Sequence, residues 1–263
     1  MDPIITLTTD FGADSPYAAA MKGVILSMNS RARLVDLSHQ IPPQNVRLAA
    51  FFLLATVPYF PSQTVHVVVI DPGVGTERAL LYVEINGQRL LTPNNGCWTG
   101  LIQQGSPPPT VIHLTETRFW RQPVSPTFHG RDILAPVAAH LSLGEDPRHL
   151  GKPRQDWVHL DVRPAILKDD RLIGEVIFID HFGNLIANIP GQELARFSEK
   201  PTRIMVGDQV VNRRVRTYAE AEPGSIVVLV SSMTLMEVAV TNGNAAEKLG
   251  ARIGTPVSIQ VVG

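Results

Sequence analysis

Hydrophobic residues follow two different patterns in the first half of the chain. Short β-branched or continuous apolar runs at 4–9, 33–37 and 65–70 predict strands. Between them, apolar residues recur every three or four positions at 17–28 and 45–57, which predicts helices. The run at 65–70 does not alternate, which is typical of a strand buried on both faces in a parallel sheet. The alternation predicts an α/β N-terminal domain with a Rossmann-like, mostly parallel sheet.

The pattern changes in the second half of the chain. After a predicted helix at 134–143, the segment 153–164 is polar, flanked by prolines and without periodicity, so it is interpreted as a linker. Many short apolar runs separated by turn residues then predict an all-β, barrel-like C-terminal domain. Strands are expected at 174–179, 185–189, 203–206, 209–211, 225–230, 237–240 and 257–262, and short helices at 191–197 and 244–249. The predicted domains are therefore 1–152 and 165–263.

Composition narrows the class of protein. The chain has 263 residues, 44% of them hydrophobic, and a formal net charge of −1. This charge balance does not favour nucleic acid or an anionic membrane over a small ligand as the binding partner. No apolar run is long enough to span a bilayer, and the start lacks the features of a signal peptide. With Cys97 as the only cysteine, no intrachain disulfide forms, and we expect a cytoplasmic protein whose buried thiol is inert.

Two aspartates stand where predicted strands end. Asp10 either binds a pair of ribose hydroxyls or caps a turn. Asp71 opens the glycine-containing loop 71–78, in which Arg78 returns a positive charge. The loop lacks the Gly-Lys-Ser/Thr ending of a phosphate-binding loop and the third glycine of a dinucleotide fingerprint. It is either a close backbone approach to a ligand or a tight structural loop with a surface Asp–Arg pair.

Two later motifs carry candidate chemistry. His129, followed by a glycine, is a candidate general base or a histidine that is merely hydrogen-bonded, and Arg131 and Asp132 after it are interpreted as a structural ion pair. Asn184, in the motif 180–184, either reads an adenine edge or forms a β-turn. The eight histidines show no metal-ligand spacing, and no Gly-x-Ser-x-Gly motif occurs. A metalloenzyme or serine hydrolase is therefore not expected.

Seven short motifs, taken together and in order, resemble one family across nearly the whole chain. That family is the S-adenosylmethionine (SAM) hydroxide adenosyltransferases, or SAM hydrolases, which are related to the fluorinase and chlorinase. The resemblance implies hydrolysis of SAM to adenosine and methionine, with no metal or cofactor. It also implies a homotrimer with active sites between the N-terminal domain of one subunit and the C-terminal domain of its neighbour. The matching motifs are 9–12, 21–23, 71–75, 92–96, 128–132, 180–184 and 243–246.

The resemblance also assigns roles to single residues. The set that activates water in the hydrolases corresponds to Asp71, Arg78 and His129, and the halogenases lack this set. Water needs a proton acceptor and an orienting group, whereas a halide needs desolvation and no base. The residues expected to bind substrate are Asp10 for ribose, Asp180, Ser231 and Ser232 for the amino-acid part, and Asn184, Tyr218, Glu237 and the backbone near Val240 for adenine.

The chain departs from the family pattern in two places. Met233 stands in a loop that usually carries glycine, and Ala187 replaces a common threonine. Both changes concern the expected methionine and adenine contacts and leave the water-activating set untouched. Two alternatives stay open: a halide-dependent adenosyltransferase on the same scaffold, and a protein that binds SAM or adenosine without turnover.

Overall fold

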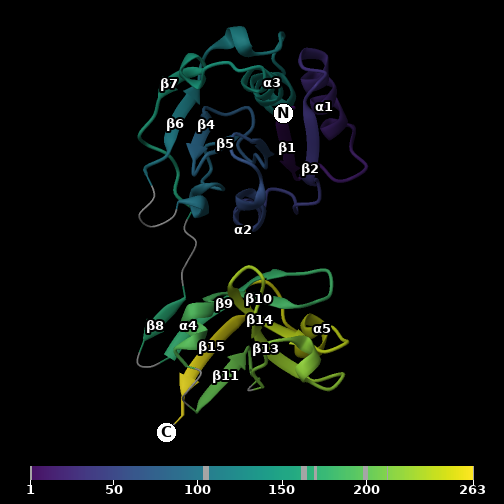
Figure 1. Cartoon of the computed structure of the whole chain (residues 1–263), viewed down its shortest axis with the longest axis vertical. Helices are drawn as coiled ribbons and strands as arrows, with labels where there is room; N and C mark the ends of the chain where they lie inside the picture. The colour runs from purple at the N-terminus through teal and green to yellow at the C-terminus, as the bar shows by residue number, and fades with distance from the viewer. Residues whose placement is uncertain are drawn as a thin grey trace. The chain divides into compact units, whose positions relative to one another are not determined.

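The chain forms two compact units, residues 1–161 and 162–263, which are described separately (Figure 1). The computed structural model describes residues 2–102, 107–160, 165–168, 171–197, 201–211 and 213–262. Among the helices of these residues, none is long and apolar enough to cross a membrane.

The first unit is built on a seven-stranded mixed sheet in the order β2-β1-β3-β5-β4-β6-β7. Strands β2, β1, β3 and β5 run parallel, whereas β5, β4, β6 and β7 pair in antiparallel fashion. The prediction of a mostly parallel sheet is therefore right for one half of the sheet and wrong for the other. The strands are β1 (Ile4–Thr9), β2 (Arg33–Ser38), β3 (Val65–Val69), β4 (Leu80–Ile85), β5 (Gln88–Pro93), β6 (Thr110–Leu114) and β7 (Gly151–Pro153).

The antiparallel half comes from a hairpin that the sequence analysis did not identify. Strands β4 and β5 are joined by Asn86 and Gly87, which both have positive φ, 51° and 77°. Two consecutive residues of positive φ make the tight turn that suits the twist of a hairpin, and Asn-Gly is its strongest sequence signal. The turn sets the register, in which Ile85 faces Gln88.

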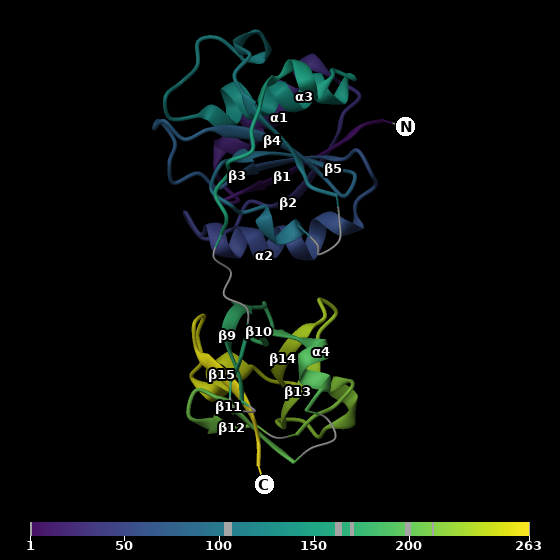
Figure 2. The ribbon, with the colours of Figure 1, turned by 90° about the vertical axis from the view of Figure 1, so that its left-hand side faces the viewer.

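Helices cover both faces of this sheet (Figure 2). On one face, Met21 and Ile25 of α1 (Pro16–Met28) and Val137 of α3 (Ala135–Ser142) pack in one hydrophobic cluster with the sheet. On the other face, Leu53 of α2 (Val46–Thr56) lies in a second cluster. Successive residues of β3 enter alternate clusters, so the strand is buried on both faces as predicted. Short helical turns are η1 (Val57–Tyr59), η2 (Thr99–Leu101), η3 (Thr117–Phe119) and η5 (Pro147–His149).

The start of the predicted linker lies against the first unit. The Val158 amide donates to Asn94 Oδ1 (2.9 Å), and the Leu160 amide donates to Thr99 Oγ1 (3.3 Å). A Cβ on Gly96 would lie 2.6 Å from the Leu160 nitrogen, so only glycine allows this approach. The last part of the predicted linker, 161–164, lies outside the described residues.

The second unit is a curled antiparallel sheet in the order β12-β11-β15-β9-β10-β14-β13, with β8 paired to β9. The long strand β9 pairs with β15 along its first half and with β10 along its second half. This supports the expected all-β character of the region. The elements are β8 (Ile166–Lys168), β9 (Arg171–Ile179), β10 (Leu185–Pro190), α4 (Gly191–Ala195), β11 (Thr202–Val206), β12 (Gln209–Val210), η6 (Tyr218–Glu220), β13 (Ile226–Val230), β14 (Leu235–Val240), α5 (Ala245–Leu249) and β15 (Pro256–Val261).

One hydrophobic cluster holds the second unit together. Alternate residues of β14, including Val238 and Val240, enter it with Ile204 and Ile259, while Glu237 and Ala239 face the other side of the sheet. Helix α5 begins at the capping residue Asn244 and ends at a left-handed glycine, as the sequence signals for a helix predict.

Candidate active site

Three of the predicted residues meet in the first unit. Asp71 stands two residues after the end of the buried strand β3, and Arg78 closes the loop that Asp71 opens. His129 stands at the start of a short π-helical segment, η4 (Gly130–Leu134), which continues into α3. Single π-helical turns frequently occur at functional sites.

Arg78 links the other two members of this cluster. Its Nε lies 2.7 and 2.9 Å from the two carboxylate oxygens of Asp71, and its Nη2 lies 2.5 Å from Asp71 Oδ2. The same Nη2 lies 2.8 Å from His129 Nδ1. Only 7% of the Asp71 side chain and 12% of the Arg78 side chain are exposed, so the ion pair is shielded from bulk water.

The contact with Arg78 defines the protonation state of His129. A guanidinium only donates hydrogen bonds, so Nδ1 of His129 accepts, and the ring hydrogen of neutral histidine lies on Nε2. Burial and the positive charge of Arg78 lower the pKa of His129 below its usual value of 6.5. The cluster therefore contains a carboxylate, a guanidinium and a neutral imidazole that presents an N–H.

Backbone geometry holds the three residues in place. Gly75 has φ +80°, and a Cβ there would lie 3.0 Å from the carbonyl oxygen of Pro126, in the segment before His129. Asn95 donates from Nδ2 to the carbonyl oxygen of Ile70 (2.8 Å) and so fixes the end of β3. Sequence reasoning quoted Asn95 within a motif without giving it this role, which depends on a contact between distant segments.

The Arg131–Asp132 ion pair predicted from the sequence is present. Arg131 Nε and Nη2 each lie 2.7 Å from an Asp132 oxygen. The Asp132 side chain is fully buried and also accepts from Arg121 Nη1 (3.1 Å) and the Ser125 amide (2.9 Å). Asp132 thus ties the segment before His129 to the segment after it.

Asp10 lies at the same edge of the sheet as this cluster. Strands β1 and β3 are parallel neighbours, with Thr9 opposite Val69, so Asp10 and Asp71 follow adjacent strand ends. Asp10 Oδ2 accepts a hydrogen bond from the Gln44 amide at 2.8 Å. Ligands of open α/β sheets bind at such carboxyl ends.

The second unit holds a separate polar cluster. Asp180 Oδ1 accepts from the amides of Phe182 (2.9 Å) and Asn184 (2.8 Å), and its Oδ2 accepts from Asn184 Nδ2 (2.9 Å). A Cβ on Gly183 would lie 2.0 Å from Asn244 Oδ1, so the motifs 180–184 and 243–246 pack closely. The motif forms a turn, as one of the two alternatives expected, and among the described residues no hydrogen bond reaches the side-chain carbonyl oxygen of Asn184.

Tyr218 and Glu237 form the other half of the second cluster. The Tyr218 hydroxyl donates to Glu237 Oε1 at 2.5 Å, and Glu237 is only 5% exposed. Burial raises the pKa of Glu237, and the negative charge of Asp180 adds to the effect.

The remaining predicted binding residues lie along the β13–β14 hairpin. Ser231 is buried at its turn, where its amide donates to the Leu235 carbonyl, and its hydroxyl has no partner among the described residues. Ser232 follows it. Val240 lies at the far end of β14, about 17 Å from Leu235 at 3.3–3.4 Å per residue. Its side chain belongs to the core, so only its backbone is available to a ligand.

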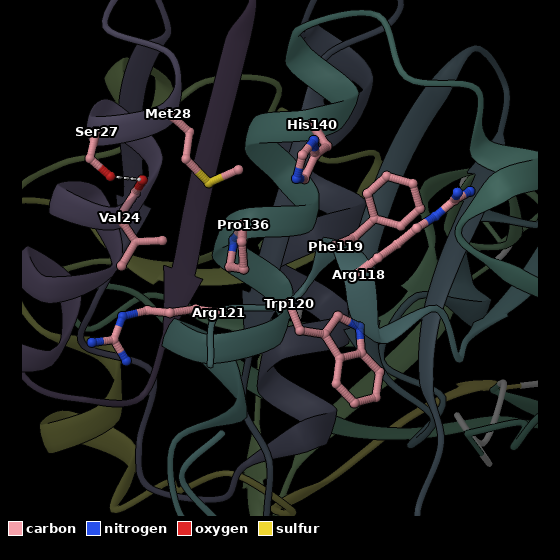
Figure 3. Close-up of a pocket in the computed structure, with 9 residues that line it drawn as sticks. All are labelled: Val24, Ser27, Met28, Arg118, Phe119, Trp120, Arg121, Pro136 and His140. Atoms are coloured by element: carbon pink, nitrogen blue, oxygen red, sulfur yellow. Dashed lines mark hydrogen bonds between the residues drawn. The ribbon is translucent and has the colours of Figure 1, made fainter. Parts of the chain in front are cut away.

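The other candidate features of the molecule are less suited to catalysis. A cavity of about 380 Å³ lies between α1, η3 and α3 in the first unit and contains none of the predicted residues. Figure 3 shows that its two arginines, Arg118 and Arg121, point away from each other. Cys97 is buried, and burial raises its pKa to about 11, as expected of an inert thiol. In the described part of the chain, no three His, Cys, Asp or Glu side chains group as a metal site would.

Comparisons with known proteins identify the family of the chain. Residues 5–151 match the SAM hydroxide adenosyltransferase N-terminal domain, and residues 174–258 match its C-terminal domain. The (R)-S-adenosyl-L-methionine hydrolase of Thermus thermophilus is 37% identical, covering 98% of this chain and 100% of that protein. The (R)-S-adenosyl-L-methionine hydrolase of Salinispora arenicola is 34% identical, covering 98% of this chain and 97% of that protein.

More distant relatives and solved structures complete the comparison. The fluorinase of Actinoplanes sp. is 24% identical, covering 98% of this chain and 97% of that protein. The crystal structure of a conserved protein from Thermotoga maritima is 31% identical and superposes with a TM-score of 0.90, covering 97% of this chain and 99% of that one. The matches extend over both compact units. The chain belongs to the SAM hydroxide adenosyltransferase family.

Proposed function

We propose that this protein is an enzyme that hydrolyses S-adenosyl-L-methionine to adenosine and L-methionine. The observation that carries the proposal is the Asp71–Arg78–His129 cluster, in which Arg78 binds both partners within 3 Å. The relatives named as SAM hydrolases, which match over nearly the whole chain, support the same reaction.

The reaction is an in-line displacement at the C5′ carbon of the sulfonium. Water attacks opposite the sulfur, the C5′–S bond breaks, and its electron pair neutralises the sulfur as methionine leaves. One water proton is released, which balances the charge. The positive charge on sulfur disappears in the transition state, so a site that excludes water favours the reaction.

The cluster provides the groups that this step needs. The Nε2–H of His129 donates to the water oxygen and orients it. Nδ1 of His129 is occupied by Arg78, so the lone pairs of Asp71 that Arg78 leaves unused receive the proton. Arg78 keeps Asp71 oriented and stabilises the developing hydroxide. Positioning of this kind contributes roughly 7–11 kcal/mol to well-aligned reactions.

The binding roles follow the family resemblance. Asp10 holds the ribose hydroxyls. Asp180, Ser231 and Ser232 hold the amino-acid part of the substrate. Adenine meets Asn184, Glu237 and the backbone near Val240, and Tyr218 stacks on it. The unpartnered buried hydroxyl of Ser231 supports a ligand there, because a buried polar group without a partner is costly.

A second candidate function is transfer of the adenosyl group to a halide, which the distant likeness to a fluorinase raises. The charged cluster argues for water, because a halide site needs no proton acceptor. The third candidate is binding of SAM or adenosine without turnover.

One experiment separates these three functions. The pure protein is incubated with SAM and chloride in oxygen-18 water, and the nucleoside product is weighed by mass spectrometry. Hydrolysis gives adenosine heavier by about two mass units, whereas halide transfer gives 5′-chloro-5′-deoxyadenosine. Recovery of intact SAM after hours would establish binding alone.

We propose in addition that the chain acts as a cytoplasmic homotrimer without a metal or cofactor, and that neighbouring chains supply the two polar clusters of each site. A head-to-tail interface used three times closes into a ring. Mixing tests this: an inactive Asp71→Ala protein and an inactive Asn184→Ala protein regain activity after subunit exchange if sites are shared. Absence of recovery despite proven exchange would contradict shared sites. Activity that EDTA abolishes and a divalent ion restores would contradict the absence of metal.

A further inference from the structure

The loop that carries Asp10 is held at three points by the segment that follows β2. The Gln44 amide donates to Asp10 Oδ2 at 2.8 Å. The Gly12 amide donates to the His39 carbonyl oxygen at 2.8 Å, and the Thr9 hydroxyl lies 2.9 Å from His39 Nδ1. Two of these three bonds belong to His39, and they bind the residues on either side of Asp10.

The surroundings of His39 orient its ring. Only 12% of its side chain is exposed, and Nε2 lies 3.0 Å from Asp36 Oδ1, although the N–H does not point straight at that oxygen. Lys22 belongs to the motif 21–23, to which the proposed function gives no role. Its Nζ lies 2.5 Å from the other carboxylate oxygen of Asp36. Lys22 thus holds Asp36, and Asp36 in turn faces the His39 ring.

The hydroxyl of Thr9 can donate to the His39 ring. The Phe11 amide lies 3.3 Å from Thr9 Oγ1 and donates to it, which leaves the hydroxyl hydrogen free to reach His39 Nδ1. The ring hydrogen then lies on Nε2, on the side of Asp36. His39 thus binds residues on both sides of Asp10, through the Thr9 hydroxyl before it and the Gly12 amide after it.

The order hydroxyl, imidazole and carboxylate is also that of a nucleophilic triad, but burial argues against that role. Thr9 is fully buried, so its oxygen cannot reach a substrate. In contrast, Asp10 is only half-buried, and its Oδ1 accepts no hydrogen bond within the described part of the chain. The network is therefore built to present the carboxylate rather than to react.

We infer that His39 is a positioning residue: through Thr9 and Gly12 it fixes the Asp10 carboxylate for the ribose hydroxyls of the substrate. This inference rests on the ribose role that the proposed function gives to Asp10. A contact to the ribose hydroxyls exists in both the bound substrate and the transition state. Its loss therefore raises KM and leaves kcat nearly unchanged.

The test is steady-state hydrolysis of SAM by the variants His39→Ala, Thr9→Val and Thr9→Ser. Thr9→Val removes the hydroxyl with little change of shape, and Thr9→Ser restores it. We expect KM to rise about tenfold in His39→Ala and Thr9→Val, with kcat within about threefold, and Thr9→Ser to stay near the wild type. A purely structural loss reduces the folded fraction, which lowers the apparent kcat at unchanged KM.

A double-mutant cycle completes the test. In an Asp10→Asn background, His39→Ala should change KM by less than about twofold, because the carboxylate that it positions is gone. An equal effect of His39→Ala in both backgrounds, or an unchanged KM in the wild-type background, would overturn the inference. If the wild-type protein itself does not hydrolyse SAM, the proposed function fails instead. If His39→Ala does not fold, the Thr9→Val and Thr9→Ser pair decides.

Discussion

The polar clusters of the two compact units differ in what holds their charged groups. In the first unit, Asp71 and Arg78 belong to one loop and His129 to a distant segment, and Arg78 bonds to both of the others. In the second unit, Asp180 is satisfied by amides of its own turn, and the Tyr218 hydroxyl binds Glu237 of a nearby strand. This difference suggests that the first cluster performs chemistry, whereas the second binds and orients.

The largest effect on activity is expected in the cluster of the first unit, to which the comparison of the two clusters assigns the chemistry. Asp71→Asn keeps the shape of the side chain but removes the charge and the proton acceptor. We expect adenosine formation to fall by about 10³-fold, measured by chromatography of the product, because a general base contributes about 10²–10⁴-fold. Asn184→Asp is the matched change in the second unit and should mainly raise KM. Near-normal turnover by a folded Asp71→Asn protein would remove Asp71 from the mechanism.

The next effect tests whether the first cluster depends on contact between its loops. Gly75→Ala adds a Cβ 3.0 Å from the Pro126 oxygen at φ +80°, so the loop has to move away from the His129 segment. We expect kcat to fall about tenfold to a hundredfold, since small misplacements are costly in catalysis.

Gly254→Ala is the control for Gly75→Ala, because Gly254 has φ +86° and open space around its Cβ position. It carries the same type of backbone strain without the contact, and activity should be retained. Equal losses of kcat in the two variants would mean that strain alone, and not the loop contact, is responsible.

Acidification should destabilise the first unit more than the second. His66 is fully buried in the first unit, where Nδ1 accepts from Thr6 and Nε2 donates to Gln88, and burial lowers its pKa to about 4. A lowered pKa means that the neutral ring stabilises the fold above pH 6.5 and that this contribution is lost as the pH falls toward 4. At pH 5 the loss is roughly 2 kcal/mol of unfolding free energy.

Glu237 titrates in the opposite sense in the second unit. Because its pKa is raised, the fold favours the protonated form, and acidification relieves the cost of burying its charge. Hydrogen exchange followed by mass spectrometry at pH 7 and pH 5, corrected for the intrinsic rate, resolves the two units. At pH 5 the backbone amides of β3 and β5 should be less protected from exchange than at pH 7, whereas the amides of β14 should not. A uniform fall in both units would contradict this assignment.

The smallest effect is expected from Tyr218→Phe. The change leaves the ring that we propose to stack on adenine but removes the hydroxyl that binds Glu237. We expect KM to rise by about threefold with little change in kcat, since one hydrogen bond in a half-exposed place is involved. Tyr59→Phe, at a side chain that is 80% exposed, is the control for loss of a hydroxyl. A fall in kcat as large as that of Asp71→Asn would contradict the division between chemistry and binding.

Local patterns in the sequence determined much of this protein. The mostly apolar run at 65–70 predicted that β3 is buried on both faces, because neither face of a strand between two helical layers meets water. Its polar residue, His66, is buried and hydrogen-bonded. Helical periodicity located α1 and α2 to within a residue or two. The candidate residues Asp10 and Asp71 were found by their place after strands. The Asn-Gly pair at 86–87 is also a sequence signal for a hairpin, but the hairpin was not predicted. The antiparallel half of the sheet was therefore not predicted either.

Tertiary structure alone decided which of these residues meet. Nothing in their spacing places Arg78 within 2.8 Å of His129, because 51 residues separate them and the folded sheet brings them together. The support of Asp10 by His39 and Gln44 has the same origin, since parallel neighbours bring loops from distant segments to one edge. Periodicity reports which face of an element is buried. Contacts between loops depend on strand order, and strand order is set by the packing of the whole sheet.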